Sequence, residues 1–203
     1  MPVRTSALRP RSRRTFALSI FLLVALVVRT ARADAADDRR ALVMLRVLAY
    51  DKRLGDRVGN EVRIVIVYPD GDAGATERTR WVTAFAAARK LKLAGHAVVV
   101  VAHKLEDLKS LDRMLEKLDP AALVACDGLA AKVSIEQLAG VTRARGVLSI
   151  TTREAEVANG LAVGIVRGNP RDEIVVNVRA ATAEGIKFDA GLLQLARTVE
   201  ERR

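Results

Sequence analysis

Two carboxylates that could carry chemistry stand close together near the middle of the chain. Asp70 and Asp72 follow directly on the run 62–68, which is rich in β-branched residues and reads as a buried strand. A carboxylate pair at the carboxyl end of a strand can hold Mg²⁺ through its oxygens. The spacing therefore raises phosphoryl-transfer chemistry as one hypothesis, and an acidic turn before a helix as the other.

The residues that follow Asp70 favour the acidic turn. The Asp-x-Asp loop of phosphotransferases of the haloacid dehalogenase type has Thr or Val at the fourth position after the first Asp. Here that position is Gly74, and Thr76 comes two places late. No downstream lysine with a paired acidic motif completes the site.

Other potentially reactive side chains are few and dispersed. His96 and His103 bracket a predicted strand and would lie roughly 23 Å apart along extended chain, too far to share a metal ion. Cys126 ends the apolar run 121–126, where a small buried thiol is commoner than a nucleophile. No glycine-rich phosphate loop or Gly-x-Ser-x-Gly elbow is present. The sequence predicts no enzyme, no metal site and no cofactor.

Polar residues at the ends of predicted strands leave a binding function open. In open α/β sheets, ligands bind at the carboxyl ends of the strands. Turn formation and helix capping would explain the same residues without any ligand. The candidate ligand-binding residues are Asp70, Asp72, Asp127, Gly128, Thr151 and Thr152.

The elements that must position these residues alternate between apolar strands and amphipathic helices. Such alternation is typical of βαβ units and predicts an α/β, doubly wound, mostly parallel sheet in a single domain, residues 34–203. Ser134 is a plausible helix N-cap. Strands are predicted at 62–68, 96–102, 121–126 and 147–151, and helices at 39–50, 79–94, 105–118 and 134–144.

The C-terminal part departs from this rhythm. Residues 161–166 and 173–179 read as two strands joined by a turn, which predicts an antiparallel hairpin at an edge of the sheet. Apolar residues spaced along 188–199 predict a closing amphipathic helix.

The first 33 residues have the composition of a secretory signal peptide. They hold seven arginines and no acid, and a 13-residue apolar run, 16–28, precedes the small-residue site Ala31-Arg32-Ala33. That run is too short for a permanent span, which needs about 20 residues. Cleavage after Ala33 is predicted, with an uncleaved anchor as the alternative, and no cysteine stands near the site to carry a lipid.

The export route stays open between two pathways. Arg13-Arg14 within the segment 12–18 resembles a twin-arginine signal, and Arg32 beside the cleavage site fits that route. The very apolar run 22–28 fits the general secretory pathway instead, in which case the arginine pair is simply basic charge.

The net charge of +10 is largely an export feature. Without the seven N-terminal arginines, 27 basic and 24 acidic residues remain, a net charge of +3. The processed chain has only five scattered aromatic residues, so it offers no stacking platform for single strands. Nucleic acid is therefore excluded as a partner.

Several segments together resemble the YfiR/HmsC-like family of small exported α/β proteins. The matching segments are the first helix with residues 45–51, the strand 62–68, the strand 146–150 and the strand 174–181, which carries Asn177. Residues 184–196 resemble the closing helix of the family, with its leucine pair followed by Leu-Ala. The resemblance covers most of residues 39–199.

The resemblance implies a periplasmic regulator that binds a partner signalling protein. The best-known family role is the restraint of a membrane-bound diguanylate cyclase through its periplasmic part. Two features depart from the family pattern. Cys126 is the single cysteine, so no intramolecular disulfide switch can form, and the first helix lacks the aromatic-rich segment ending in Trp-Pro.

Three functions follow from these observations. The first is a periplasmic, non-enzymatic regulator or sensor that contacts an envelope or inner-membrane signalling protein, such as a diguanylate cyclase or sensor kinase. The second is a periplasmic small-ligand binding module accessory to a transporter or sensor, and the third is an exported hydrolase. The processed chain is expected to have no permanent membrane span, and a homodimer stays open.

Overall fold

The computed structural model describes residues 35–86, 91–168 and 171–200. The predicted signal peptide and its cleavage site lie outside the described residues. Within the described part, no helix is both long enough and apolar enough to cross a membrane.

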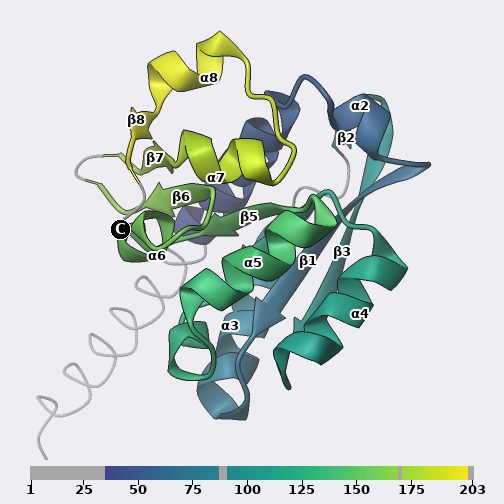
Figure 1. Ribbon diagram of the computed structural model, residues 1–203, viewed down its shortest axis with the longest axis vertical. Coiled ribbons are helices and arrows are strands. Elements are labelled where there is room, and N and C mark those ends of the chain that lie inside the picture. The colour runs from purple at the N-terminus through teal and green to yellow at the C-terminus, as the bar shows by residue number, and fades with distance from the viewer. Residues whose placement is uncertain (1–34, 87–90, 169–170, 201–203) are drawn as a thin grey trace, which may run out of the picture. The chain divides into compact units, whose positions relative to one another are not determined.

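Eight strands among the described residues form one sheet in the order β2-β3-β1-β4-β5-β6-β7-β8 (Figure 1). The five strands from β3 to β6 in this order are mutually parallel, whereas β2 and β7 run antiparallel to their neighbours β3 and β6. This confirms the predicted mostly parallel sheet. The strands are β1 (Glu61–Tyr68), β2 (Lys92–Leu93), β3 (His96–Lys104), β4 (Ala122–Ala125), β5 (Leu148–Thr151), β6 (Val163–Val166), β7 (Glu173–Val176) and β8 (Arg197–Thr198).

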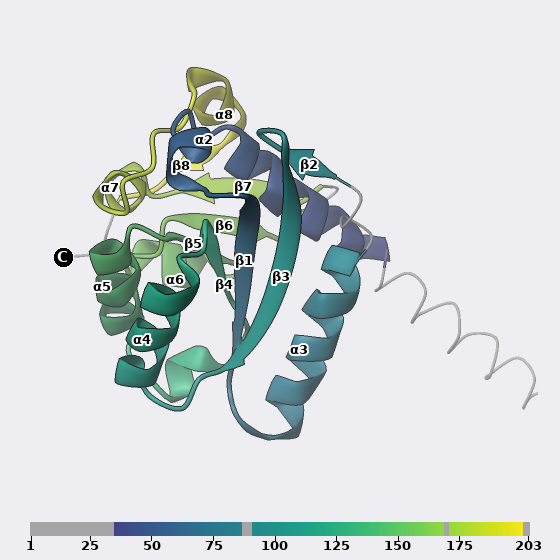
Figure 2. The same ribbon diagram turned by 90° about the vertical axis from the view of Figure 1, so that its right-hand side faces the viewer.

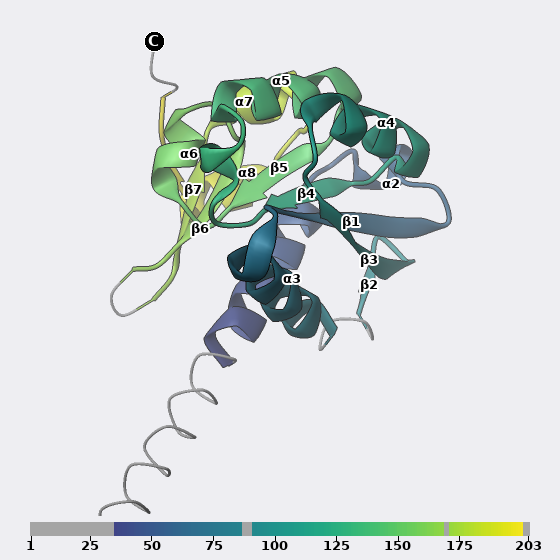
Figure 3. The same cartoon turned by 90° about the horizontal axis from the view of Figure 1, so that it is seen from below.

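Helices cover both faces of the sheet (Figure 3). The first helix, residues 35–49, and α3 (Gly71–Ala86) lie on one face, and α4 (Leu108–Leu118) and α5 (Ile135–Arg145) lie on the other. The strand β1 shows why both faces must be covered, since Ile64 and Ile66 join the core beneath α3 while Val65 and Val67 join the core beneath α4 and α5. A strand that is apolar on both faces is typical of a buried parallel sheet.

Local signals define the starts of α4 and α5 and the end of α5. The Asp107 carboxylate accepts a hydrogen bond from the Ser110 amide at 2.6 Å, and the Ser134 hydroxyl accepts one from the Gln137 amide at 3.2 Å. The predicted cap at Ser134 is therefore confirmed. Helix α5 ends at Gly146, whose φ of +65° suits glycine better than any residue with a side chain.

The helix predicted at 79–94 is wrong at both ends. Helix α3 begins at Gly71, directly after Asp70, and its described part ends at Ala86. Its first turn packs so closely that a Cβ added at Gly74 would lie 1.8 Å from the Pro69 carbonyl oxygen. Glycines that permit this packing also lower helix propensity, so the sequence suggested a loop there.

The glycine predicted to end that helix belongs to a hairpin instead. Ala94 and Gly95 both have positive φ, 49° and 85°, and form the two-residue turn between β2 and β3. Two successive residues with positive φ match the type I′ turn, whose twist suits a tight antiparallel hairpin.

The predicted strand at 173–179 and closing helix at 188–199 are both too long. Strand β7 ends at Val176 because the next residue, Asn177, caps a helix. The side-chain oxygen Oδ1 of Asn177 accepts a hydrogen bond from the Ala180 amide at 2.9 Å. The closing helix ends at Leu195, which is 68% exposed, and the chain then returns as β8 beside β7. The hairpin of β6 and β7 is confirmed but is not at the edge. The closing helix is α8 (Ala190–Leu195). Four other short helices of the described part were not predicted: α2 (Leu54–Arg57), η2 (Leu129–Ala131), α6 (Glu154–Ala158) and α7 (Val178–Ala183).

Candidate functional site

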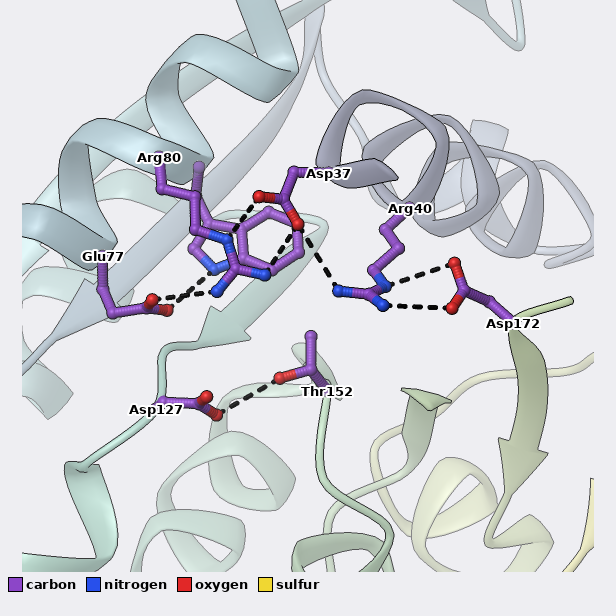
Figure 4. Close-up of polar contacts among 8 residues, drawn as sticks. Asp37, Arg40, Glu77, Arg80, Asp127, Thr152 and Asp172 are labelled. Carbon is purple, nitrogen blue, oxygen red and sulfur yellow. Dashed lines mark hydrogen bonds and ion pairs between the residues drawn. The ribbon is translucent and has the colours of Figure 1, made fainter. Parts of the chain in front are cut away.

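The candidate site lies at the carboxyl ends of neighbouring parallel strands. Because β4 and β5 are paired in the sheet, the residues that follow them lie side by side. The Thr152 hydroxyl donates a hydrogen bond to the Asp127 carboxylate at 3.2 Å (Figure 4). The Arg153 guanidinium approaches the same carboxylate at 3.9 Å. Both Asp127 and Thr152 are partly exposed, so a small polar molecule could reach them.

Asp70 belongs to a different group of charges. Its carboxylate accepts a hydrogen bond from the Gly71 amide at 2.9 Å and lies 3.9 Å from the Lys104 ammonium and 3.8 Å from the Lys132 ammonium. The hydrogen bond from the Gly71 amide lowers the pKa of Asp70 most, and the charges of the two lysines lower it further. Asp72 is exposed in the first turn of α3. No group of three histidine, cysteine or acidic residues in the described part could hold a metal ion.

The hydroxyl of Thr151 is used inside the protein. Thr151 is fully buried and donates a hydrogen bond to the Glu156 carboxylate, while its oxygen accepts one from the Arg153 amide at 3.1 Å. Burial raises the pKa of Glu156. This hydroxyl therefore holds the turn after β5 rather than facing outward as Thr152 does.

Gly128 and Cys126 have packing roles at the end of β4. Gly128 has a φ of +91°, and a Cβ there would lie 3.3 Å from the Pro69 side chain, so the loops after β1 and β4 touch. Cys126 is 1% exposed, and burial raises the pKa of its thiol well above the ordinary value. A thiol that stays protonated is a poor nucleophile.

A row of alternating charges, here called the charge ladder, lies beside the site (Figure 4). The Arg80 guanidinium donates to Asp37 at 2.6 and 2.7 Å and to Glu77 at 2.9 Å. The Arg40 guanidinium donates to Asp172 at 3.1 and 3.2 Å and to Asp37 at 3.4 Å. The ladder therefore runs Glu77–Arg80–Asp37–Arg40–Asp172 and joins α3, the first helix and the start of the β7 region.

Sequence reasoning missed the charge ladder entirely. Its local signal is the i,i+3 spacing of opposite charges, Asp37 with Arg40 and Glu77 with Arg80. That spacing is common on exposed helices, but here the side chains of Arg40 and Asp37 are only 6% and 11% exposed. The Arg80 guanidinium also lies 5.0 Å from the centre of the buried Trp81 ring.

The charge ladder and the Asp127–Thr152 pair face one another across the end of β4 (Figure 4). Burial first, and then the charges of Glu77 and Asp127, raise the pKa of Cys126, so both carboxylates act on its thiol. Fixed carboxylates, guanidinium groups and a hydroxyl can orient a polar ligand by hydrogen bonds. This set contains no activated nucleophile.

A second polar cluster is buried between α5, β5 and α7. The Glu184 carboxyl group, fully shielded from solvent, accepts hydrogen bonds from the Ser149 amide at 2.9 Å and from the Thr142 hydroxyl at 2.6 Å. Burial raises the pKa of Glu184 to about 7, although both contacts and the charge of Arg143 act to lower it. The Thr142 hydroxyl lies 3.1 Å from the Ala139 carbonyl as well, so it can donate there and accept from a protonated Glu184.

Comparison with known proteins gives one family and several similar structures. The sequence profile described as YfiR/HmsC-like matches residues 83–197, and no curated protein matches the chain. The ligand-free, open structure of a substrate-binding protein with adhesive properties from Clostridium difficile is similar, with 13% identity and a TM-score of 0.50 over 74% of this chain. An ABC domain in complex with L-Trp from Streptococcus pneumonia has 16% identity and a TM-score of 0.53 over 75%.

A conserved domain protein from Vibrio cholerae is also similar, with 15% identity and a TM-score of 0.57 over 80% of this chain. The matches cover 58%, 62% and 59% of those three chains, so this chain spans about three fifths of their length. At such identities the likeness establishes an α/β fold shared with binding proteins.

Proposed function

The chain belongs to the YfiR/HmsC-like family, and on that premise we propose that it is an exported, non-enzymatic regulator of the cell envelope that acts by protein–protein contact. The observation that carries this proposal is the family match over residues 83–197. The signal peptide predicted at residues 1–33 supports a periplasmic location. The partner is a membrane-bound signalling protein, either a diguanylate cyclase or a sensor kinase, with a periplasmic part that this chain contacts.

A deletion strain tests the regulatory role directly. If the chain restrains a diguanylate cyclase, deletion raises cellular cyclic-di-GMP, and a plasmid copy of the full chain restores the normal level. A copy that lacks residues 2–33 stays inside the cell and is the matched control, which should fail to restore it. A C-terminally tagged full chain, cross-linked in living cells, should also recover a membrane signalling protein. Unchanged cyclic-di-GMP together with no such protein recovered would contradict the proposal.

A second function is a small-ligand binding module, and the fold likeness to substrate-binding proteins favours it. In this version the ligand lies at the carboxyl edge of the sheet, against Asp127, Gly128 and Thr152. Thr151 supports the turn from inside, because its hydroxyl is bonded to Glu156. Since the site combines carboxylates with guanidinium groups, a zwitterionic molecule such as an amino acid suits it chemically.

A thermal-shift screen of the processed protein against free amino acids, L-Trp included, tests this second function. A true ligand raises the melting temperature in a concentration-dependent way. The variant Asp127→Ala should abolish that rise, whereas Glu136→Ala, which removes an exposed carboxylate on α5, should leave it intact. A rise that is equal in both variants, or no rise with any amino acid, would remove this function.

A further inference from the structure

The strand β3 carries a long unpaired edge. On one side β3 pairs with β1 along nearly its whole length, from Ala97 to Lys104. On the other side β2 pairs only with His96 and Ala97. Among the described residues no strand pairs with the remaining edge, residues 98–104. Figure 2 shows β3 in front of β1, with no labelled helix crossing in front of β3.

The turn before β3 determines which backbone groups face this edge. In a hairpin with a two-residue turn, the closing pair exchanges both backbone hydrogen bonds, so the N–H and C=O of His96 point toward β2. These directions alternate along a strand, so Val98, Val100, Ala102 and Lys104 point outward as well. The odd-numbered residues should then direct their N–H and C=O groups toward β1. The Leu105 amide does so, because it donates to the Tyr68 carbonyl of β1 at 2.9 Å.

The side chains along this edge lack the usual protection against strand pairing. Exposed edges are commonly blocked by charges, proline or bulges. Here the segment from Val98 to Ala102 is entirely apolar, and residues 99–103 are only partly buried although helices cover both faces of the sheet. Burial lowers the pKa of His103, so its ring is uncharged at neutral pH. Lys104 is the single charged side chain, at the far end.

We propose that β3 pairs antiparallel with β3 of a second copy of this chain, about a two-fold axis at Val101, so that the two sheets become continuous. In this register Val100 faces Ala102, Val98 faces Lys104, and Val101 faces its own copy. All the outward-pointing groups from Val98 to Lys104 then form hydrogen-bonded pairs. Centring the axis one residue earlier on Val100 would place Lys104 against His96, whose edge β2 already occupies.

A second copy fits this edge better than an unrelated strand does. The centre of the segment is uncharged, so its complement must also be uncharged and rich in β-branched residues. The segment itself has that composition. The antiparallel arrangement also keeps the two lysines at opposite ends of the pair, each opposite Val98. A closed two-fold dimer pairs the β3 edge of each copy with that of the other. No free β3 edge then remains to bind a third chain.

A cysteine placed at the axis tests the register. In the background Cys126→Ala, the variant Val101→Cys places two thiols on directly opposed residues that are not hydrogen-bonded, with Cα atoms about 4.5 Å apart, within reach of a disulfide. The processed protein should form a covalent dimer on mild oxidation. In the matched control Val99→Cys, each new cysteine faces His103 of the second copy. The two cysteines are then about 13 Å apart along the strand and should not form a disulfide.

Mass measurement by light scattering gives an independent readout. The unchanged protein should have the mass of a dimer, Val101→Thr should keep it, and Val101→Lys, which opposes two ammonium groups, should convert it to a monomer. A protein that is monomeric at all concentrations would overturn the proposal and leave the edge to another protein's strand. Equal cross-linking of the two cysteine variants would overturn it too. The cysteine pair decides the matter even if Val101→Lys does not fold.

Discussion

The carboxyl group of Glu184 shows how burial sets the charge of a single residue. Its hydrogen-bond partners suit both of its ionisation states, because Thr142 can donate to the carboxylate or accept from the carboxyl group. Burial nevertheless favours the neutral form, and its pKa of about 7 lies well above the ordinary 4.5. The folded chain therefore holds a proton at mildly acidic pH that the unfolded chain has released.

This proton predicts a pH-dependent contribution to stability. Between pH 4.5 and pH 7 the folded state binds more protons than the unfolded state does, so the free energy of unfolding falls as pH rises, by roughly 3 kcal/mol at most from this residue. Glu184→Gln keeps the hydrogen bonds and removes the ionisation. The free energy of unfolding of this variant, measured by urea denaturation, should fall less between pH 4.5 and pH 7 than that of the unchanged protein. At pH 8 the variant should be the more stable of the two.

The control for this prediction is Glu136→Gln, an exposed change on α5. It should keep the full fall of stability with pH, because Glu184 is unchanged in this variant. If Glu184→Gln shows the same pH dependence as Glu136→Gln, the buried carboxyl is ionised in the folded protein and the argument from burial is wrong.

At the scale of elements, the charge ladder attaches the first helix to the rest of the fold. Asp37 is the central anion, since both Arg40 and Arg80 donate to it. Asp37→Ala leaves two partly buried guanidinium groups with fewer partners and should lower the free energy of unfolding by about 2 kcal/mol. Urea denaturation at neutral pH measures this. Asp38→Ala, the same change one residue further along the helix, should change stability by less than about 0.5 kcal/mol.

Equal effects of the two alanine variants would mean that the ladder adds nothing beyond the charge of a helix N-terminus. Salt gives a second criterion. Because the Asp37 side chain is largely buried, its contribution should persist at high ionic strength, where contributions from exposed pairs are screened.

The elements that sequence predicts best are those whose signal is local and repeated. The run of β-branched residues in β1 and the leucine spacing of α4 specify their elements without help from the rest of the chain. The start of α3 could not be predicted in this way, since Gly71 and Gly74 both disfavour a helix. Gly74 is needed for the close packing against Pro69, whereas Gly71 has a positive φ of 85°. Likewise, the end of β7 depends on Asn177, whose amide side chain donates to the Val157 carbonyl of α6.

The candidate site was predictable as a place but not as a set of contacts. Parallel strands bring their carboxyl ends to one edge, and this alone groups Asp70, Asp127 and Thr152 there. Which of them meet depends on strand order and on rotamers, and only Asp127 and Thr152 are bonded to each other. The charge ladder lies beyond sequence reasoning because its members come from segments more than 40 and more than 130 residues apart in the chain, as in the pairs of Asp37 with Arg80 and Arg40 with Asp172.

At the scale of the whole molecule, the predicted signal peptide carries most of the net charge. Its predicted removal would take away seven arginines and reduce the net charge from +10 to +3. Mass spectrometry of protein recovered from the periplasm should give a chain that begins at Asp34. Ala33→Leu, which alters the small residue before the cut, should accumulate as the longer precursor. Unprocessed chain in the membrane fraction would instead indicate an uncleaved anchor.

The export route is decided by changing the arginine pair. Replacing Arg13 and Arg14 by lysine keeps the charge of this region but removes the twin-arginine signal. Export that stops in this variant identifies the twin-arginine route, and export that continues identifies the general secretory pathway. The double change Arg9→Lys and Arg11→Lys is the matched control and should be exported by either route.

The charge ladder also constrains how this protein can evolve. Each inner member contacts two neighbours of opposite sign, so reversing one charge creates two repulsive contacts at once. Changing one neighbour as well repairs one contact but breaks the next contact along the ladder, so no single second substitution relieves the repulsion. The signs of the inner charges should therefore be hard to change, and the first helix cannot alter its charges independently of α3 and of the segment before β7.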